Sequence, residues 1–270
     1  MNQATHPRPE IGLIIVGDEI LSGKRQDKHL SQVIALLAER GLQLSWARYL
    51  GDDRQALAEC LKQTFNGGDV VFSCGGIGAT PDDHTRQAAA QALGVELRLH
   101  PQAQALIAER TAEMAREGKA ASADMSLPEN RQRLRMGEFP AGANIIPNPY
   151  NRIPGFQWAS HWFVPGFPVM AWPMIAWVLD THYRDHFHQI AMADRSARVL
   201  ELAESTLTPL MEEVERTWPD VKVYSLPSVG EGGIRRHIEL GAKGDPVAVE
   251  AAFERLMQGV RDLGGAIEPA

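Results

Sequence analysis

The sequence has little cysteine and no excess of positive charge. Its 270 residues include two cysteines, Cys60 and Cys74, and each lies within an apolar pattern. No disulfide framework is therefore expected, which favours a cytoplasmic location. With 27 Lys and Arg against 34 Asp and Glu, the net charge of -7 gives no general attraction to nucleic acid or to anionic membranes. Any phosphate group must be held by a local site.

Several catalytic motifs are also absent. The sequence has no Gly-x-Ser-x-Gly elbow, and its histidines lack metal-ligand spacing, so neither a covalent hydrolase nor a zinc enzyme is indicated. Residues 17–24 depart from a P-loop, because Arg25 follows Lys24 where Ser or Thr is required. Residues 76–78 lack the third glycine of a dinucleotide fingerprint. Neither standard nucleotide-binding motif is present.

Two segments bear on targeting and membranes. Residues 1–10 are polar and contain no apolar core of signal-peptide length, so we expect a disordered leader. Residues 162–179 carry no charge over nearly the length of a membrane span, but three prolines and a glycine interrupt them. We expect a buried strand, a turn and a helix there, and no membrane partner.

The first half of the chain alternates apolar runs with amphipathic segments. Residues 11–16 and 70–74 are continuous apolar runs typical of strands covered on both faces, and residues 42–50 predict a further strand. Helical spacing of apolar residues separates these runs. The order predicts an α/β domain over residues 11–185, with a mainly parallel sheet and helices on both faces.

The predicted strands end in glycines and polar residues. The carboxyl ends of parallel strands meet at one edge of a sheet, where α/β proteins bind their ligands. Gly17-Asp18, Gly51-Asp52 and Gly75-Gly76 should therefore converge. Two later predicted strands, residues 144–146 and 162–164, also end in turns that contain proline. The convergence predicts a binding site at this edge.

Residues 73–85 form the central motif of that edge. Gly75, Gly76 and Gly78 permit close approach of the backbone to a ligand. Thr80 is predicted to cap a helix that has Pro81 at its first position. Free amides and the helix dipole would then favour an anion. We predict that the three glycines and Thr80 bind phosphate.

Four aspartates accompany this motif, namely Asp18, Asp52, Asp82 and Asp83. Carboxylates repel phosphate unless a divalent cation lies between them, and such an ion can polarise a phosphoanhydride. We therefore expect Mg²⁺ or another divalent metal. Asp82 is interpreted as a turn residue, whereas Asp18, Asp52 and Asp83 are interpreted as functional.

The last 80 residues differ in character from the rest. Amphipathic and apolar patterns predict a helix to residue 217, strands at 221–224 and 234–240, and a helix over 246–263. These elements would form a small α+β accessory domain of α-β-β-α order over residues 191–270. The glycine-rich turn at 230–233 is similar to the Gly-x-x-Gly loop of RNA-binding KH modules. Acidic residues outnumber basic ones in this domain, so a hairpin turn is favoured and no nucleic acid partner is expected.

The motifs together resemble a known family. Residues 17–23, 51–53, 75–85 and 165–168 are similar to the molybdopterin-binding domain of molybdenum cofactor biosynthesis proteins. The resemblance is greatest to the version of this domain found at the amino terminus of the competence/damage-inducible protein A (CinA) family. The tail resembles the KH-like domain that follows it there. The resemblance implies a molybdopterin or nucleotide ligand at the sheet edge.

The resemblance also implies roles for particular residues. Asp52 and Asp83 match two aspartates that handle Mg²⁺ and the phosphoanhydride in adenylyl-transferring relatives, so they are the implied catalytic and metal-binding residues. Asn148, Pro165 and Gly166 match ligand-binding loops of the family. Some CinA relatives are instead metal-dependent pyrophosphatases that act on ADP-ribose. The family commonly forms dimers or trimers, so a homo-oligomer is expected.

The chain departs from the family pattern at three positions. His29 replaces an asparagine, Ala79 replaces a proline, and Asn151 stands where a glycine normally follows Asn148 by three residues. Two hypotheses therefore remain. The protein is either an enzyme with Mg²⁺-dependent phosphoanhydride chemistry, by pterin adenylylation or pyrophosphate hydrolysis, or a non-catalytic binding or scaffold protein that retains the pocket.

Overall fold

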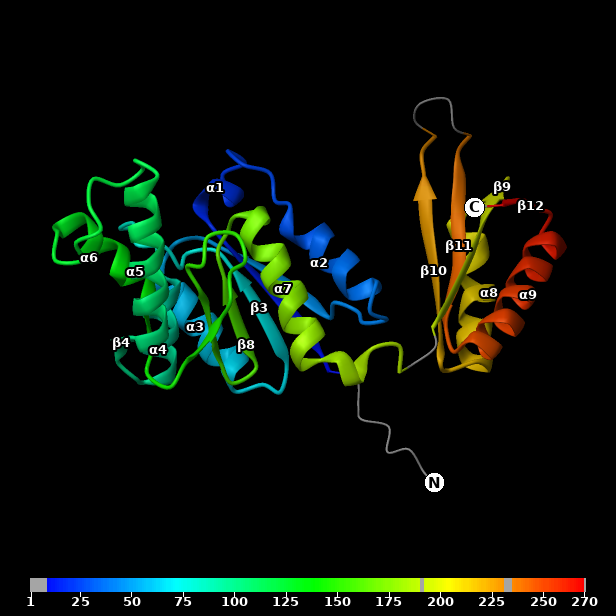
Figure 1. The fold of residues 1–270 in the computed structure, drawn as a ribbon. Coiled ribbons are helices and arrows are strands. Elements are labelled where there is room, and N and C mark those ends of the chain that lie inside the picture. Colours follow the sequence, from blue (N-terminus) through cyan, green and yellow to red (C-terminus); the bar gives the residue numbers. More distant parts are fainter. Residues whose placement is uncertain (1–8, 190–191, 231–234, 270) are drawn as a thin grey trace, which may run out of the picture. The chain divides into compact units, whose positions relative to one another are not determined.

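The computed structural model describes residues 9–189, 192–230 and 235–269 (Figure 1). The chain divides into two compact units, Met1–Phe187 and His188–Ala270. The division falls between the two domains that the sequence predicts. Most of the expected leader, residues 1–8, lies outside the described residues.

The first unit is built on a six-stranded sheet. Its strands are β1 (Ile11–Val16), β2 (Trp46–Leu50), β3 (Val70–Cys74), β6 (Asn144–Ile146), β7 (Gly155–Trp158) and β8 (His161–Val164), in the order β2-β1-β3-β8-β7-β6. The first four of that order run parallel, and β7 is antiparallel to both of its neighbours. Strand β6 consequently points the same way as β8. The predicted mainly parallel sheet is confirmed.

Helices cover both faces of this sheet. The helices of this unit are α1 (Asp18–Leu21), α2 (His29–Ala38), α3 (Arg54–Phe65), α4 (Thr85–Leu93), α5 (Pro101–Arg116), α6 (Pro128–Leu134) and α7 (Pro168–His182), with 3₁₀ turns at Arg135–Gly137 and Arg184–His186. A small sheet pairs β4 (Leu97–Leu99) with β5 (Glu138–Pro140). Figure 1 shows α2 and α7 side by side across one face. Among the described residues, no helix is long and apolar enough to span a membrane.

The alternation of side chains along β1 explains the two layers. Leu13 and Ile15 join the core cluster formed with α2 and α7, whereas Ile14 and Val16 join the cluster formed with α3, α4 and α5. Successive side chains of a strand point to opposite faces, so a strand buried on both sides must be apolar throughout. All six residues of β1 are buried.

The second strand begins later than the sequence predicts. Leu42 is buried, but it packs into the core from the segment that precedes the strand. Sheet pairing starts beside Ser45, whose backbone N–H donates to the carbonyl of Ile11 and whose hydroxyl accepts from the N–H of Ile11. The apolar residues of this segment therefore indicated burial correctly and the strand boundary incorrectly.

The second unit differs from the predicted α-β-β-α order. It contains β9 (Ala193–Leu200), α8 (Glu204–Thr217), β10 (Val221–Ser228), β11 (His237–Gly244), α9 (Pro246–Asp262) and β12 (Ala266–Pro269). The strands form one antiparallel sheet in the order β10-β11-β9-β12.

The first predicted helix of this unit is wrong over residues 193–200. Ala197 and Val199 enter the core while Arg198 between them is exposed, which is the alternation of a strand. Because β9 pairs with a strand on each side, backbone hydrogen bonds outweigh the local helical pattern. The glycine-rich turn includes residues 231–233, which lie outside the described residues. The likeness to a KH-like domain stays a prediction.

Candidate functional site

A cavity of about 760 Å³ lies at the edge where the parallel strands of the first unit end. Residues that follow β1, β2, β3, β6 and β8 line it. Of the ten site residues predicted from the sequence, nine line this cavity: Asp52, Gly75, Gly76, Gly78, Thr80, Asp83, Asn148, Pro165 and Gly166. Asp18 is outside the lining but bonds directly to Asp52.

The glycine loop that follows β3 is held tightly against the sheet. Gly75 has φ +110°, and a Cβ atom there would lie 2.4 Å from the carbonyl oxygen of Val16. Only glycine adopts this conformation and approach without strain. Thr85 fixes the other side of the loop, since its hydroxyl donates to the carbonyl of Gly75 and its N–H donates to the carbonyl of Gly76, each at 3.0 Å.

The helix after the glycine loop begins at Thr85, so the predicted capping role of Thr80 is wrong. Residues 80–83 form a turn in which the N–H of Asp83 donates to the carbonyl of Thr80. The carboxylate of Asp83 accepts hydrogen bonds from both the N–H and the hydroxyl of Thr80. These bonds satisfy the turn locally and delay the helix. A Cβ atom on Gly78 would lie 2.4 Å from Asp83 Oδ2, so the loop and the carboxylate are in close approach.

Arg86 is buried beside the glycine loop and supports its backbone through hydrogen bonds. Its side chain is 1% exposed and donates to the carbonyls of Gly78, Arg135 and Glu138. Burial lowers the pKa of Arg86, and the carboxylates of Glu138 and Asp83 oppose that shift. The guanidinium therefore connects the loop to the segment before β5. The role of Arg86 was not predicted from the sequence, because an arginine in an alanine-rich helix carries no signal of burial.

Asp18 and Asp52 form a reciprocal pair between the ends of β1 and β2. The N–H of Asp18 donates to Asp52 Oδ2 at 2.9 Å, and the N–H of Asp52 donates to Asp18 Oδ1 at 3.2 Å. Burial raises the pKa of Asp52, with further upward contributions from Asp18, Glu19 and Asp82, although the hydrogen bond from Asp18 opposes the shift. Negative charge therefore concentrates at this wall of the cavity, and a bound cation would relieve it.

The side chains at the cavity can supply only some of the ligands that a metal ion requires. Among the described residues, no group of three or more His, Cys, Asp or Glu side chains is arranged to hold a metal ion. Magnesium is commonly held by one or two carboxylates together with substrate phosphates and water. Asp52 and Asp83, which both line the cavity, fit that pattern.

The cavity is also lined by residues that the sequence motifs did not indicate. Lys24 and Arg25 line it and provide positive charge for an anion. An apolar part is lined by Met136, Ile153 and Met170, together with Phe167, whose side chain is 56% exposed. Phe167 belongs to the 165–168 motif, which was the available signal. The cavity therefore combines a charged part with an apolar part.

His29 buttresses the loop that carries Gly166. The imidazole is 4% exposed, and its Nε2 lies 3.0 Å from the Gly166 carbonyl oxygen. Asp27 fixes the start of α2, where its carboxylate accepts from the N–H groups of His29 and Leu30. The imidazole therefore contacts the backbone of the loop and is not positioned as part of the cavity lining.

The loop of residues 148–153, called here the 148–153 loop, forms another wall of the cavity. The side chain of Asn148 is 4% exposed and donates to the carbonyl of Ile153 at 3.0 Å. The N–H of Arg152 donates to the carbonyl of Asn148, also at 3.0 Å. Arg152 has φ +65°, a left-handed conformation that is unusual for a residue other than glycine. Asn148 thus organises the loop through its hydrogen bonds.

The fold and the cavity define an α/β protein with an anion-compatible site at the carboxyl edge of a parallel sheet. A family model described as "Probable molybdopterin binding domain" matches residues 12–184. The chain belongs to this molybdopterin-binding domain family, as the sequence motifs predicted.

Curated relatives extend the comparison. A CinA-like protein of Koribacter versatilis is 29% identical over 229 residues, which are 81% of this chain and 52% of that protein. A protein of Aeropyrum pernix is 29% identical over 272 residues, 97% of each chain. The chain thus spans about half of the Koribacter protein and nearly all of the Aeropyrum protein.

A solved structure supports the fold. The crystal structure of the protein CinA with unknown function from Thermoplasma acidophilum matches with a TM-score of 0.53 at 24% identity, covering 66% of this chain and 99% of that chain. This match confirms the predicted α/β fold. The similarity to a CinA-like protein among the curated relatives agrees with the predicted resemblance.

Proposed function

We propose that the protein binds molybdopterin or an adenine nucleotide through its phosphate groups in the cavity of the first unit. The observation that carries the proposal is the convergence of the Gly75–Gly78 loop, Lys24 and Arg25 on one cavity. Backbone amides in a glycine loop and two cationic side chains are suited to phosphate. The family relationship favours a pterin, and the motifs leave a nucleotide as the second ligand class.

The apolar part of the cavity supports a ligand with a planar ring. Phe167, Met170 and Ile153 line the same cavity as the glycine loop. Both pterin and adenine present a flat π-system that contacts aromatic and thioether side chains favourably. A ligand with a ring at one end and phosphate at the other would use both parts.

We further propose Mg²⁺-dependent phosphoanhydride chemistry at Asp52 and Asp83. A bound Mg²⁺ would polarise the phosphoanhydride and offset the negative charge of the wall. Asp52 is held by the N–H of Asp18, and Asp83 is held by Thr80, so both carboxylates are oriented before a ligand arrives. The reaction would be either adenylyl transfer to a pterin or hydrolysis of an ADP-ribose-type pyrophosphate.

Calorimetric titration tests the binding proposal directly. The full chain would be titrated with molybdopterin, ATP, ADP-ribose and inorganic pyrophosphate, each with and without Mg²⁺. We expect saturable binding of at least one ring-containing phosphate compound, with tighter binding in Mg²⁺. Absence of binding by every compound in both conditions would contradict the proposal.

Substitution of Asp83 tests the chemical step. With any phosphoanhydride that the wild type cleaves or transfers, we expect Asp83→Asn to lower turnover at least tenfold, because one metal-binding charge is lost. Asp262→Asn is the matched control, since Asp262 lies in the second unit, where it accepts a hydrogen bond from Gln258. Full turnover in Asp83→Asn would remove this carboxylate from the mechanism.

The second candidate function is non-catalytic binding. It is favoured by Asn151, which replaces the usual glycine of a ligand loop, and by the limited metal donor set of the described residues. In that case molybdopterin or a nucleotide would bind but stay unchanged on prolonged incubation with Mg²⁺ or Mn²⁺. Product detected by chromatography at a rate proportional to protein concentration would exclude this candidate.

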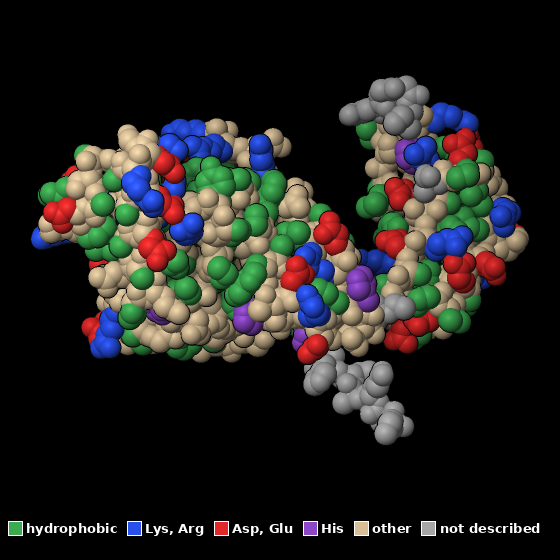
Figure 2. Space-filling view, viewed as in Figure 1, with side chains coloured by type: hydrophobic (Ala, Val, Ile, Leu, Met, Phe, Trp, Pro, Cys, Tyr) green, Lys and Arg blue, Asp and Glu red, His purple; other side chains and the backbone are tan. Residues whose placement is uncertain are grey.

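The remaining partner predictions concern macromolecules. Acidic and basic side chains are interspersed over the face shown in Figure 2, and the net charge is -7. This distribution supports a small-molecule ligand in preference to nucleic acid. A homo-oligomer, either a dimer or a trimer, stays a prediction, and sedimentation velocity of the full chain would test it.

A further inference from the structure

The 148–153 loop separates two hollows of the first unit. One is the cavity of about 760 Å³, and the other is a side pocket of about 310 Å³ that contacts α5. Asn151, Ile153 and Met136 line both of them. The loop is therefore a thin partition, and its position determines the shape of the cavity wall.

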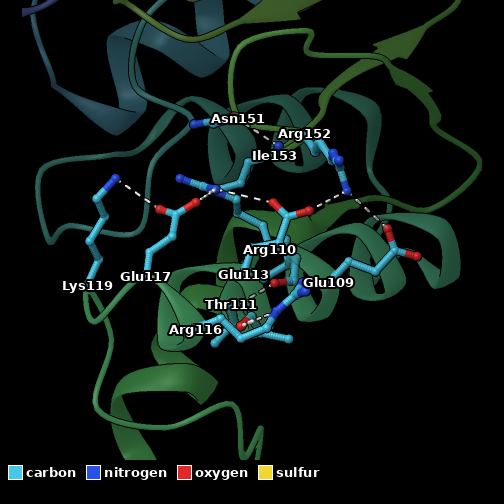
Figure 3. A network of polar contacts seen from close by, with 12 residues as sticks. Glu109, Arg110, Thr111, Glu113, Arg116, Glu117, Lys119, Asn151, Arg152 and Ile153 are labelled. Carbon is cyan, nitrogen blue, oxygen red and sulfur yellow. Dashed lines mark hydrogen bonds and ion pairs between the residues drawn. The ribbon is translucent and has the colours of Figure 1, made fainter.

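A chain of ion pairs ties this partition to α5 (Figure 3). Arg152 Nη1 lies 2.7 Å from Glu113 Oε1 and 3.8 Å from Glu109 Oε2. Glu113 also pairs with Arg110 at 3.2 Å, and Arg110 lies 3.7 Å from Glu117. Lys119 extends the series through Glu117 at 2.9 Å. We call these residues the α5 ion-pair chain.

The backbone of the loop needs such support. Arg152 occupies the left-handed region at φ +65°, where the backbone of any residue other than glycine is strained. Its two neighbours, Asn151 and Ile153, both line the cavity. Asn151 Oδ1 accepts from the N–H of Ile153 at 2.9 Å, so these residues are mutually fixed. A shift of Arg152 would move both.

An isolated ion pair at a protein surface contributes little to the free energy of unfolding, because solvent screens the charges and the side chains lose conformational entropy when they pair. The pair at Arg152 differs from that case. Its partner Glu113 is 24% exposed and is shared with Arg110, which is 23% exposed, so three charges are held together. Networks with partly buried members contribute more than single exposed pairs.

We propose that Arg152 is a positioning residue for the ligand site, which it serves by pairing with Glu113 and thereby fixing Asn151 and Ile153 at the cavity wall. The proposal rests on the proposed function only for its ligand. Arg152 itself lines neither hollow. It acts through the two residues beside it.

The test combines a ligand-free measurement with a binding measurement. Amide hydrogen exchange of residues 148–154 would be followed in the full chain without ligand, and dissociation constants would then be measured for the compound in the titration panel that the wild type binds most tightly. The variants are Arg152→Gln, which removes the charge, and Arg152→Lys, which keeps it. Arg98→Gln is the matched control, because Arg98 on β4 pairs with Glu96 in the described part of the chain, and its neighbours Leu97 and Leu99 line neither hollow.

We expect Arg152→Gln to accelerate exchange at the Arg152 and Ile153 amides several-fold and to weaken ligand binding about fivefold. Arg152→Lys should retain most of the protection and affinity, and Arg98→Gln should change neither. In a Glu113→Gln background, the change at position 152 should have no additional effect, because the pair is already broken.

The proposal fails if Arg152→Gln leaves exchange and affinity unchanged, or if Arg152→Lys loses as much as Arg152→Gln. A purely global loss of stability would accelerate exchange throughout the first unit, and this result would also contradict a local positioning role. If the wild type binds no compound, the proposed function fails, and the ligand-free exchange alone decides whether Arg152 fixes the wall.

Discussion

The two units of this protein differ in whether they bury polar side chains. The buried polar or charged side chains within the described residues all lie in the first unit, and they are His29, Thr64, Ser73, Thr85, Arg86, Thr111, Asn130, Asn148 and His161. In the second unit, charged groups pair at the surface, as Arg255 does with Glu213.

The difference has a physical explanation. A buried polar group requires partners and gains nothing over an apolar residue of the same shape, so it is retained where it performs a task. Thr85, Arg86 and Asn148 each hold loop backbone at the cavity. The core of the second unit contains only apolar side chains among its buried described residues. Several of the buried polar side chains therefore support the loops of the candidate site.

The largest expected effect is a loss of stability that is confined to the second unit. Leu256 is fully buried in the second core, so Leu256→Ala should cost about 3 kcal/mol of the free energy of unfolding. Hydrogen exchange should increase across residues 193–269, while ligand binding by the first unit should stay unchanged. Loss of binding would show that the two units depend on each other.

The next prediction concerns the glycine loop. Gly75→Ala places a Cβ atom 2.4 Å from the Val16 carbonyl oxygen, and we expect a loss of about 2 kcal/mol by urea denaturation, together with weaker ligand binding. Gly94→Ala is the control, since Gly94 also has positive φ but has no atom within 4 Å of the added carbon. Gly94→Ala should cost about 1 kcal/mol and spare binding. Equal losses of stability and of binding in the two variants would contradict a specific requirement for glycine at position 75.

A smaller effect is expected at the apolar part of the cavity. Phe167→Ala should weaken the binding of a ring-containing ligand about fivefold, corresponding to about 1 kcal/mol, and leave the affinity for inorganic pyrophosphate unchanged. Val169→Ala serves as control, because Val169 is 52% exposed on α7 and does not line the cavity. Calorimetry would separate these cases. Parallel losses for both ligands would contradict a ring contact.

The smallest expected effect is a gain in stability. Because the pKa of Asp52 is raised, the native state binds more protons than the unfolded state between the ordinary and the raised pKa. Stability therefore falls as pH rises through that window, and the full penalty remains at neutral pH. Asp52→Asn should raise the free energy of unfolding by a few tenths of a kcal/mol at pH 7, because solvent screens a partly exposed group.

The gain from Asp52→Asn should vanish near pH 3, where the wild-type carboxyl is already protonated. An asparagine oxygen can still accept the hydrogen bond from the Asp18 N–H, so the loop geometry should persist. Urea denaturation at both pH values measures the effect. Any Mg²⁺ stimulation of binding should fall in the same variant, and a variant with lower stability at pH 7 would contradict the electrostatic interpretation.

Apolar patterns predicted the centre of the first sheet well, because β1 and β3 are buried on both faces. The runs at residues 11–16 and 70–74 became β1 and β3, and their ends met at one edge. The same patterns failed at β9, where strand pairing on both sides outweighed a charged, helix-like sequence. Local composition cannot report hydrogen bonds made to distant strands.

The site was predictable in outline and not in detail. Glycine motifs located the loop, but they did not show that Asp83 would bind Thr80 and move the helix start to Thr85. Exposed Lys24 and Arg25 became cavity residues only through the path of the chain between α1 and α2. Such contacts depend on tertiary packing, which spacing along the sequence does not encode.

Because β7 runs antiparallel to β6, the segment that joins these two strands can vary in sequence at the edge of the sheet that carries the cavity. Strands β6 and β7 pair over three residues, Asn144–Ile146 against Gly155–Gln157, so both ends of the intervening segment are anchored in the sheet. Surface connections of this kind tolerate substitution and insertion better than the strands that carry them. A lineage could therefore alter the eight positions between these anchors, and with them the ligands accepted, without refolding the domain.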